Sequence, residues 1–488
     1  MRRGPLPFWP AIAGCVVIAI ALRLPFMQTP LSVDEGGFAA IARAWSRGGH
    51  LYREIWVDRP QGLLLEYRAA LALFGDGGIA VRALAVVAAC GITIAIGLAV
   101  RALLSARAGI IAAALFATLS VAPTLEGFAA NGELLTALPS TIAIALAVSW
   151  AKTQARVALL LGAGLSAGFA FLVKQSGYDA GIAIALWLAL GSLRGTLGRS
   201  HARRGLIALI TGGLVMLALS LLHGALTGWH DFWFALADYR LSVESVYTAP
   251  ISQRAQLLWS SFGSAAPATA PLLVFAALGI RPAWRNGQAR LLPLWLALSF
   301  SGFLLGGLFH PHYYIGLIAP LSALSAFGIV EFVRRFSPRA LAVGLAALLI
   351  APIVVALPSY TADGLRSRSL ASSNDSRIVT NAAVARYIDT HSSPTERIYA
   401  MFANASLYFA ADRPAAFRYL WFLGVKHIPG ATGQLNDTLA GRRAPLLIAQ
   451  YQKPGDIDPS GGIATTLARR YRQVAVVDGI PILRLQNS

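Results

Sequence analysis

Residues 84–100 read Leu-Ala-Val-Val-Ala-Ala-Cys-Gly-Ile-Thr-Ile-Ala-Ile-Gly-Leu-Ala-Val, an unbroken run without a charged residue. A second run of this kind extends from Ala340 to Leu357. Runs of about 17 to 25 apolar residues match the thickness of the hydrocarbon core of a bilayer. The chain repeats the pattern along its 488 residues, of which 56% are hydrophobic and 13% charged. We therefore expect an α-helical polytopic membrane protein.

Taken in order, the apolar runs predict about eleven transmembrane helices. Their approximate bounds are 8–27, 79–100, 108–124, 134–151, 157–173, 178–193, 205–226, 257–280, 291–309, 313–333 and 340–358. The first run follows Met-Arg-Arg and resembles a signal peptide, but it lacks a small-x-small cleavage site and ends at Arg23. We therefore interpret it as an uncleaved first helix.

The distribution of charge predicts the orientation of the chain in the membrane. The net charge is +19, and the basic residues are concentrated in alternate loops, such as 194–204 and 281–290. By the positive-inside rule these loops and the amino terminus are cytoplasmic. The acidic residues fall almost entirely in the opposite loops, so we expect a site on the extracytoplasmic face of an inner or plasma membrane. The short basic loops do not indicate a nucleic-acid partner.

The organisation predicted along the chain has two parts. Residues 1–358 form the transmembrane part, with long outer loops at 28–78 and 228–254 and an amphipathic helix at 35–47. Residues 359–488 form a small extracytoplasmic α/β domain. Its patterns predict helices at 382–390 and 465–471 and strands at 397–402, 445–450, 473–478 and 482–485. Cys15 and Cys90 both lie in apolar runs, so they indicate neither a disulfide framework nor a metal site.

The acidic pair Asp34 and Glu35 in Ser-Val-Asp-Glu is the best candidate for chemistry, because carboxylates beside an apolar span are costly and usually functional. Ser32 followed three residues later by Glu35 is also a capping box, which gives Glu35 a structural alternative. For Asp34 the alternative is only a favourable place near the positive end of a helix dipole, which contributes less than about 1 kcal/mol.

Other polar residues at the predicted outer boundary are further candidates for the site. Arg59, beside Asp58 and before Pro60, forms either a surface ion pair or a fork that binds phosphate. Asn131 can cap the next helix, but capping leaves Glu133 unexplained, so both are candidates for an acceptor or metal contact. Lys174, next to Gln175, departs from the positive-inside trend, which favours an anionic partner over simple snorkelling to the interface.

The stretch His-Pro-His-Tyr-Tyr at 310–314 lies at the same predicted boundary. His310 and His312 could bind a metal or a phosphate, but the motif lacks a third ligand, so its metal signal is weak. An interfacial aromatic belt is the structural alternative. A divalent metal therefore stays open as a cofactor, and His310 joins the acceptor or metal candidates.

At these residues the chain resembles the glycosyltransferase C superfamily, and in it the branch of protein O-mannosyltransferases and lipid A aminoarabinose transferases. The resemblance rests on short motifs in the order Asp34-Glu35, Tyr52, Arg59-Pro60-Gln61, Asn131-Gly-Glu133, Lys174-Gln175 and His310-Pro-His312-Tyr313-Tyr314. Gln61 departs from the Lys-Pro-Pro or Arg-Pro-Pro of many relatives, and Asn131-Gly-Glu133 departs from the Arg-x-Asp of some. The subfamily and its acceptor therefore stay open.

The resemblance implies an enzyme that moves a hexosyl or pentosyl group from a polyprenyl-phosphate sugar, with inversion, to a lipid, glycan or protein acceptor. It implies that Asp34, with Glu35 beside it, is catalytic, and that Asp34 is the general base. Donor-phosphate contacts would come from Arg59, Lys174, Gln175, His312 and Tyr313, with the two cations stabilising the departing phosphate. Membrane lipids are the other expected partners.

Two other classes of protein compete with an enzyme. A flippase or transporter of lipid-linked sugars would also have many spans, but it should carry ionisable or broken segments near the bilayer midplane. Here the charged residues lie at the ends of the predicted spans, which favours the enzyme. A scaffolding membrane protein would leave the one-sided carboxylates unexplained.

Overall fold

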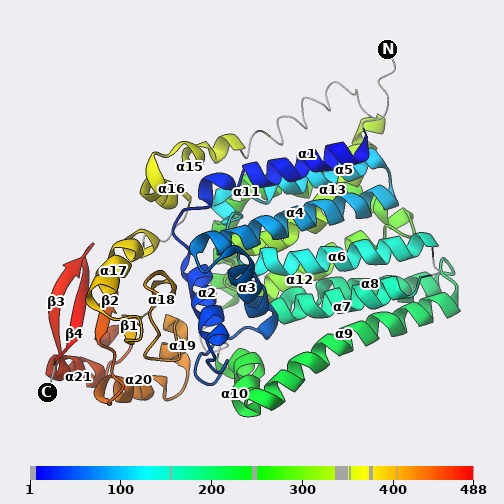
Figure 1. The fold of residues 1–488 in the computed structure, drawn as a ribbon. Coiled ribbons are helices and arrows are strands. Elements are labelled where there is room, and N and C mark those ends of the chain that lie inside the picture. The colour runs from blue at the N-terminus through cyan, green and yellow to red at the C-terminus, as the bar shows by residue number, and fades with distance from the viewer. Residues whose placement is uncertain are drawn as a thin grey trace.

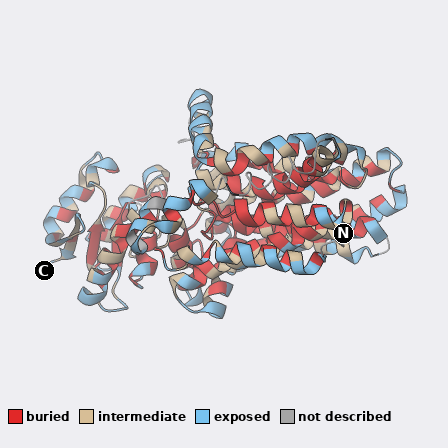
Figure 2. Cartoon of the chain, turned by 90° about the horizontal axis from the view of Figure 1, so that it is seen from above, coloured by how far each residue is buried: buried red, intermediate tan, exposed pale blue. Residues whose placement is uncertain are grey.

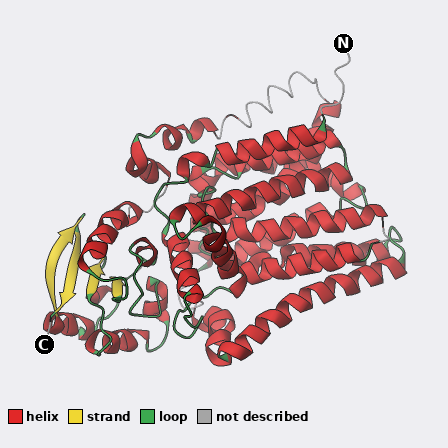
Figure 3. Ribbon diagram, in the orientation of Figure 1, coloured by secondary structure: helices red, strands yellow, loops and turns green. Residues whose placement is uncertain are grey.

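The computed structural model describes residues 7–153, 156–243, 250–335, 350, 353–372, 377–402 and 404–486. Long helices lie side by side in a bundle, and a smaller region of helices and strands adjoins one end of it (Figure 1). All four strands of the described residues belong to this smaller part, residues 377–486, which we call the C-terminal region (Figure 3).

Seven helical segments in the described residues are long and apolar enough to cross a membrane. They are Phe8–Phe26, comprising α1 (Phe8–Ala21) and η1 (Leu24–Phe26); α4 (Gly78–Leu103); α6 (Gly132–Thr153); Gln175–Leu193, comprising η3 (Gln175–Tyr178) and α8 (Asp179–Leu193); α9 (Arg199–Thr227); α11 (Ile251–Arg285); and Pro311–Arg334, from η6 (Pro311–Tyr314) and α13 (Ile315–Arg335). Shorter apolar helices are α5 (Ala106–Leu119), α7 (Ala158–Val173) and α12 (Leu291–Gly306). The expected multi-pass helical membrane protein is thereby confirmed.

The predicted number of eleven spans stays a prediction. Most of the last one, 340–358, lies outside the described residues, as do residues 336–339 before it. The proposed boundary at residue 358 therefore also stays a prediction. Helix α15 (Leu357–Thr361) spans this boundary, and α16 (Gly364–Ser372) follows it toward the C-terminal region.

Small residues and an apolar exterior explain why these helices form a bundle in lipid. A Cβ atom at Gly279 of α11 would overlap the carbonyl oxygen of Leu324, and one at Gly328 of α13 would overlap that of Phe275. Glycine at such positions lets two helices approach closely, which is how packing replaces the hydrophobic effect inside a membrane. Buried residues concentrate along the inner sides of the bundle helices, and exposed ones along its surface (Figure 2).

The predicted amphipathic helix in the first long loop is observed as α2 (Val33–Ser46), and α3 (Gln61–Phe74) follows it. Helix α2 lies between the bundle and the C-terminal region (Figure 1). Arg43 is a charged residue of this amphipathic helix, and such a residue is expected to be exposed, but its side chain is buried. Its Nε lies 2.8 Å from Asp76 Oδ1 and its Nη1 lies 3.0 Å from Asp412 Oδ1, because the C-terminal region covers that face.

The second long loop, predicted at 228–254, contains α10 (Trp229–Trp233) and the π-helix η4 (Phe234–Val243). Residues 244–249 of this loop lie outside the described residues. Phe232, Ala235 and Tyr239 are buried, so the loop packs on the protein in addition to carrying exposed aromatic side chains such as Trp229 and Trp233.

The C-terminal region is a four-stranded mixed sheet with helices. Strand order is β1-β2-β4-β3; β1 pairs parallel with β2, whereas β4 is antiparallel to both β2 and β3. The strands are β1 (Ile398–Met401), β2 (Leu447–Gln450), β3 (Tyr471–Val477) and β4 (Ile480–Leu485), and the helices are α17 (Arg377–His391), α18 (Ser406–Ala410), α19 (Phe422–His427), α20 (Ala431–Ala440) and α21 (Gly462–Arg470). The predicted strands and two predicted helices occur near their expected positions, whereas α18, α19 and α20 were not predicted.

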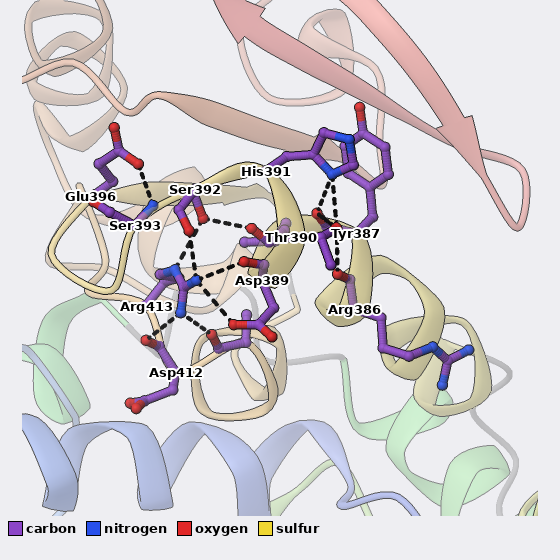
Figure 4. A network of polar contacts seen from close by, with 12 residues as sticks. Arg386, Tyr387, Asp389, Thr390, His391, Ser392, Ser393, Glu396, Asp412 and Arg413 are labelled. Atoms are coloured by element: carbon purple, nitrogen blue, oxygen red, sulfur yellow. Dashed lines mark hydrogen bonds and ion pairs between the residues drawn. The ribbon is translucent and has the colours of Figure 1, made fainter.

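A buried arginine joins two of these helices. The Arg413 guanidinium donates hydrogen bonds to Asp389 Oδ1 at 3.0 Å, to the Ser392 carbonyl at 2.8 Å and to the Ala411 carbonyl at 3.0 Å (Figure 4). A buried guanidinium is stable only when its donors are satisfied. This network fixes the end of α17 against the turn after α18, and α18 is the element that contacts α2.

Candidate active site

The end of the bundle near the C-terminal region contains a pocket of about 200 Å³, which we call the central pocket. Polar residues from several distant stretches line it: Asp34, Glu35, Asp58, Arg59, Glu126, Asn131, Glu133, Lys174, Arg240, His310, His312 and Tyr313. Every candidate site residue expected from the sequence is among them except Gln175, which lines an adjoining cavity. The fold therefore brings the short sequence motifs together in one place.

Asp34 lies in the first turn of α2, where its half-buried side chain faces the central pocket. Its Oδ1 accepts a hydrogen bond from Trp421 Nε1–H at 3.0 Å. Trp421 belongs to the C-terminal region and lines the same pocket. A carboxylate in this position is held in place and can accept a proton from a group bound in the pocket.

Glu35 is adjacent in sequence but has different surroundings. The capping box is present: Ser32 Oγ accepts from Glu35 N–H at 3.2 Å, and Glu35 Oε2 accepts from Ser32 N–H at 3.0 Å. Glu35 Oε1 accepts from Ala130 N–H at 2.9 Å and lies 3.0 Å from Arg82 Nη1. The side chains of Glu35 and Arg82 are 1% and 2% exposed. The Glu35 carboxylate thus connects the start of α2 to the segment before α6 and to Arg82 of α4.

Lys174 brings a positive charge to the pocket between α7 and η3. Its ammonium forms an ion pair with the Glu133 carboxylate and lies 4.5 Å from the centre of the Tyr313 ring. Glu133 is in the first turn of α6. A cation with one carboxylate partner and an aromatic face can still bind an incoming anion, because an ammonium has three donors.

Two arginines add to the positive charge. Asp58 Oδ2 lies 2.6 Å from Arg59 Nη1 and 2.5 Å from Arg240 Nη2, so one carboxylate bridges two guanidinium groups. Burial would lower the pKa of Arg59, but the charge of Asp58 outweighs it and raises that pKa above its usual value. Tyr52 O–H donates to the Arg59 carbonyl at 3.0 Å and so supports the loop. Both arginines are therefore oriented permanent cations.

A larger cavity of about 660 Å³, here called the apolar cavity, adjoins the central pocket. The two share Arg59, Glu133, Lys174, Arg240, Leu308 and Tyr313. Away from these shared residues, the wall of this cavity combines leucines, alanines, glycines and Phe303 with the polar residues Thr136, Ser140, Gln175, Ser176, Tyr178, Asp179 and Ser299, whereas Asp34 lines only the central pocket. The arrangement fits an amphipathic ligand whose anionic group meets the shared cations.

Three polar residues of the motifs have structural partners. Asn131 Oδ1 accepts from Leu134 N–H at 2.9 Å, which is the capping role that the sequence left open for it. Gln61 Nε2 donates to the Ser220 carbonyl at 3.1 Å, and Gln61 Oε1 accepts from Ser220 Oγ at 2.9 Å. Gln175 Nε2 donates to the Asp58 carbonyl at 3.3 Å. These contacts support the loops that carry the charged groups.

The two histidines stack on each other with ring centroids 5.6 Å apart, and His312 Nδ1 lies 3.6 Å from Glu126 Oε2. Burial, reinforced by the charge of His312, lowers the pKa of His310, so the His310 ring is neutral at pH 7. Over the residues that the structure describes, His, Cys, Asp and Glu do not come together in any group of three that could hold a metal ion.

The sequence did not single out Arg240 or Trp421. Arg240 is an arginine in the second outer loop, and the departure from the positive-inside trend that singled out Lys174 applies to it as well. Trp421 carries no such signal, because nothing local in Tyr-Leu-Trp-Phe-Leu distinguishes it from a core aromatic residue.

Comparisons with known proteins bear on this geometry. Residues 58–223 match the family model for dolichyl-phosphate-mannose-protein mannosyltransferase. The chain matches no curated protein sequence. The crystal structure of ArnT from Cupriavidus metallidurans bound to undecaprenyl phosphate is similar, with 16% identity, a TM-score of 0.66 and coverage of 97% of each chain.

Two structures of an archaeal oligosaccharyltransferase are also similar. The Archaeoglobus fulgidus enzyme in complex with Zn and sulfate is 15% identical, with a TM-score of 0.57, and the match covers 83% of this chain and 62% of that one. AglB from the same organism, in complex with an inhibitory peptide and a dolichol-phosphate, is 13% identical, with a TM-score of 0.52 and coverage of 84% and 64%. Together with the family match, these folds confirm the resemblance to the glycosyltransferase C superfamily.

Proposed function

We propose, on the premise of this glycosyltransferase C resemblance, that the protein moves a sugar from a polyprenyl-phosphate donor to a hydroxyl-bearing acceptor. The acceptor is a lipid, a glycan or a protein. The reaction takes place on the extracytoplasmic face of the membrane, with inversion at the anomeric carbon.

The observation that best supports this proposal is that the two cavities adjoin at shared cationic residues. A polyprenyl chain needs an apolar surface, its phosphate needs cations, and the sugar beyond the phosphate needs a polar pocket. The apolar cavity, the shared Arg59, Lys174 and Arg240, and the central pocket offer these three environments in that order. Asp34 lies beyond the cations, on the side where an acceptor would approach the sugar.

In the proposed reaction the acceptor oxygen attacks C1 of the sugar while its proton passes to the Asp34 carboxylate. The bond between C1 and the phosphate oxygen breaks on the opposite side of C1, and the electron pair leaves with the polyprenyl phosphate. A single displacement of this kind inverts C1. Lys174, Arg59 and Arg240 stabilise the charge that grows on the phosphate, and fixed cations do this without reorganisation during the reaction.

Asp34→Asn keeps the size of the side chain and its ability to accept from Trp421, but it removes the base. We expect turnover to fall by at least about 10²- to 10⁴-fold, to the limit of detection, with an unchanged thermal unfolding midpoint. The measurement is transfer from radiolabelled polyprenyl-phosphate sugars by purified protein in nanodiscs.

Asp238→Asn is the matched control, because Asp238 is exposed on η4, near the site but outside both cavity linings. It should retain full activity. Normal turnover in Asp34→Asn would remove Asp34 from its proposed role. Movement of a lipid-linked sugar across the bilayer without any transfer would instead favour a flippase. The glycolipids and glycoproteins lost on deletion of the gene, measured by mass spectrometry, would identify the acceptor.

A further inference from the structure

The C-terminal region contributes a side chain to the candidate active site. Trp421 lines the central pocket and donates its indole N–H to Asp34 Oδ1 at 3.0 Å. An indole N–H can only donate, so Asp34 Oδ1 must direct a lone pair toward this N–H. This contact joins the proposed base to a residue at the far end of the sequence.

The indole ring rests directly on the first turns of α2. A Cβ atom at Gly37 would come within 2.5 Å of the Trp421 ring and 2.7 Å of Ala405 Cβ, so only glycine leaves room for the ring there. The Phe38 ring centroid lies 5.5 Å from that of Trp421. Gly37 and Phe38 thus define the place of the indole beside Asp34.

The segment that carries Trp421 is anchored to the loops of the bundle. Trp56 N–H donates to the Arg418 carbonyl at 3.3 Å, and Arg418 Nη2 donates to the Tyr52 carbonyl at 2.9 Å. The Arg418 guanidinium also lies 3.3 Å from Asp231 Oδ1, and the ring of Tyr419 meets that of Trp56 edge to face at 5.2 Å. These contacts come from the first and second long loops, so the segment just before Trp421 is held from two sides.

A general base needs a defined orientation as well as a carboxylate. The terminal torsion of an aspartate is broad, so an unrestrained carboxylate samples many orientations. We propose that Trp421 is a positioning residue for Asp34: its N–H holds Oδ1 and leaves Oδ2 to take the acceptor proton. This inference rests on the proposed function, and it makes the C-terminal region part of the catalytic centre.

The test is Trp421→Phe, which retains an aromatic ring on Gly37 but removes the donor. We expect kcat to fall by about 10- to 100-fold, the cost of a small misplacement of a reacting group. The KM for the donor should change by less than about twofold, because the donor phosphate is bound by other residues. Trp45→Phe is the matched control and should be unaffected, because Trp45 lies at the opposite end of α2 from Asp34, with its ring against Arg68 and His223.

A double variant separates positioning from packing. In Asp34→Glu the base is displaced by one methylene, so adding Trp421→Phe should lower kcat little further. If the two reductions in kcat multiply instead, Trp421 acts independently of Asp34 and the inference fails. Gly37→Ala displaces the indole without altering it and should reproduce the loss of kcat. Unchanged kcat in both Trp421→Phe and Gly37→Ala would also overturn the inference. Absence of transfer by the wild-type protein would contradict the proposed function itself.

Discussion

Asp34 and Glu35 are neighbours in the chain whose side chains meet different surroundings. The Asp34 side chain is half-buried in the central pocket, whereas the Glu35 side chain is 1% exposed and paired with Arg82. Successive residues of a helix point in directions about 100° apart, so an adjacent pair is easily divided between a pocket and a core. We therefore propose that Glu35 acts by holding α2 and its neighbours in place, beside a catalytic Asp34.

This division of roles predicts opposite consequences for the two substitutions. Glu35→Gln leaves the buried Arg82 without its counter-charge, and breaking a buried ion pair in this way costs about 3–5 kcal/mol. We expect a lower thermal unfolding midpoint and a poor yield of folded protein in detergent. Asp34→Asn should leave the midpoint unchanged.

Replacing both partners, as Glu35→Leu with Arg82→Met, should recover part of the stability, because the uncompensated charge is then absent. A Glu35→Gln protein with wild-type stability and no activity would instead assign Glu35 to the chemistry.

Helix α2 links the candidate active site to the C-terminal region. Its Asp34 faces the central pocket, its Gly36 and Gly37 face α18 and Trp421, and its Arg43 reaches Asp76 and Asp412. A Cβ at Gly36 would come within 2.6 Å of Ser406 Cα, so the backbones of α2 and α18 are in close contact. Any shift of α18 is therefore transmitted to the turn that carries Asp34.

Gly36→Ala should separate these two helices. Overpacking of this kind costs about 1–3 kcal/mol, because the obstructing atom is backbone and cannot rotate away. We expect a lower thermal midpoint and faster proteolysis in the C-terminal region. Gly14→Ala is the control: a Cβ atom at Gly14 of α1 would have nothing within 4 Å, and alanine is the better helix former, so that variant should be neutral or slightly stabilised. Equal behaviour of the two variants would contradict a tight contact between α2 and α18.

Four charged residues connect α2, the loop after α3 and the C-terminal region. We call Arg43, Arg47, Asp76 and Asp412 the clasp. Arg47 Nη1 lies 2.9 Å from Asp412 Oδ1, and Arg43 Nη1 lies 3.0 Å from the same atom. Burial would raise the pKa of Asp412, but the hydrogen bond from Arg47 and the charge of Arg43 outweigh it and lower the pKa.

The clasp predicts a dependence on pH. A carboxylate whose pKa is lowered by folding adds stability above its unfolded pKa, about 3.9, and this stability is lost as the pH falls through the folded pKa. Asp412→Asn should therefore be more readily proteolysed in the C-terminal region than the wild type at pH 7. The difference should shrink as the pH falls below about 4. An unchanged difference down to pH 3 would show that Asp412 acts through its shape and hydrogen bonds rather than its charge.

Much of the fold follows from local patterns. Apolar runs located the bundle helices, and short strand-like stretches located β1 to β4, because burial in lipid and pairing in a sheet act on residues that are neighbours in the chain. The helices α18 and α19 were missed because they are short, with 5 and 6 residues. Helix α20 was missed as well, although its 10 residues exceed the 9 of α21, which was located. Asp34 and Lys174 were found because a charge beside an apolar span is costly enough to stand out in the sequence.

Hydrophobicity and charge act on residues close together in the chain, so a polytopic membrane protein with short polar motifs at the ends of its helices can be inferred without coordinates. That these motifs surround one pocket, that Glu35 pairs with Arg82 and that Arg43 is buried became visible only in the fold. The contact between Trp421 and Asp34 spans 387 positions of sequence. A hydrogen bond of 3.0 Å between such distant residues depends on how bundle and sheet pack together, and no local pattern records that packing.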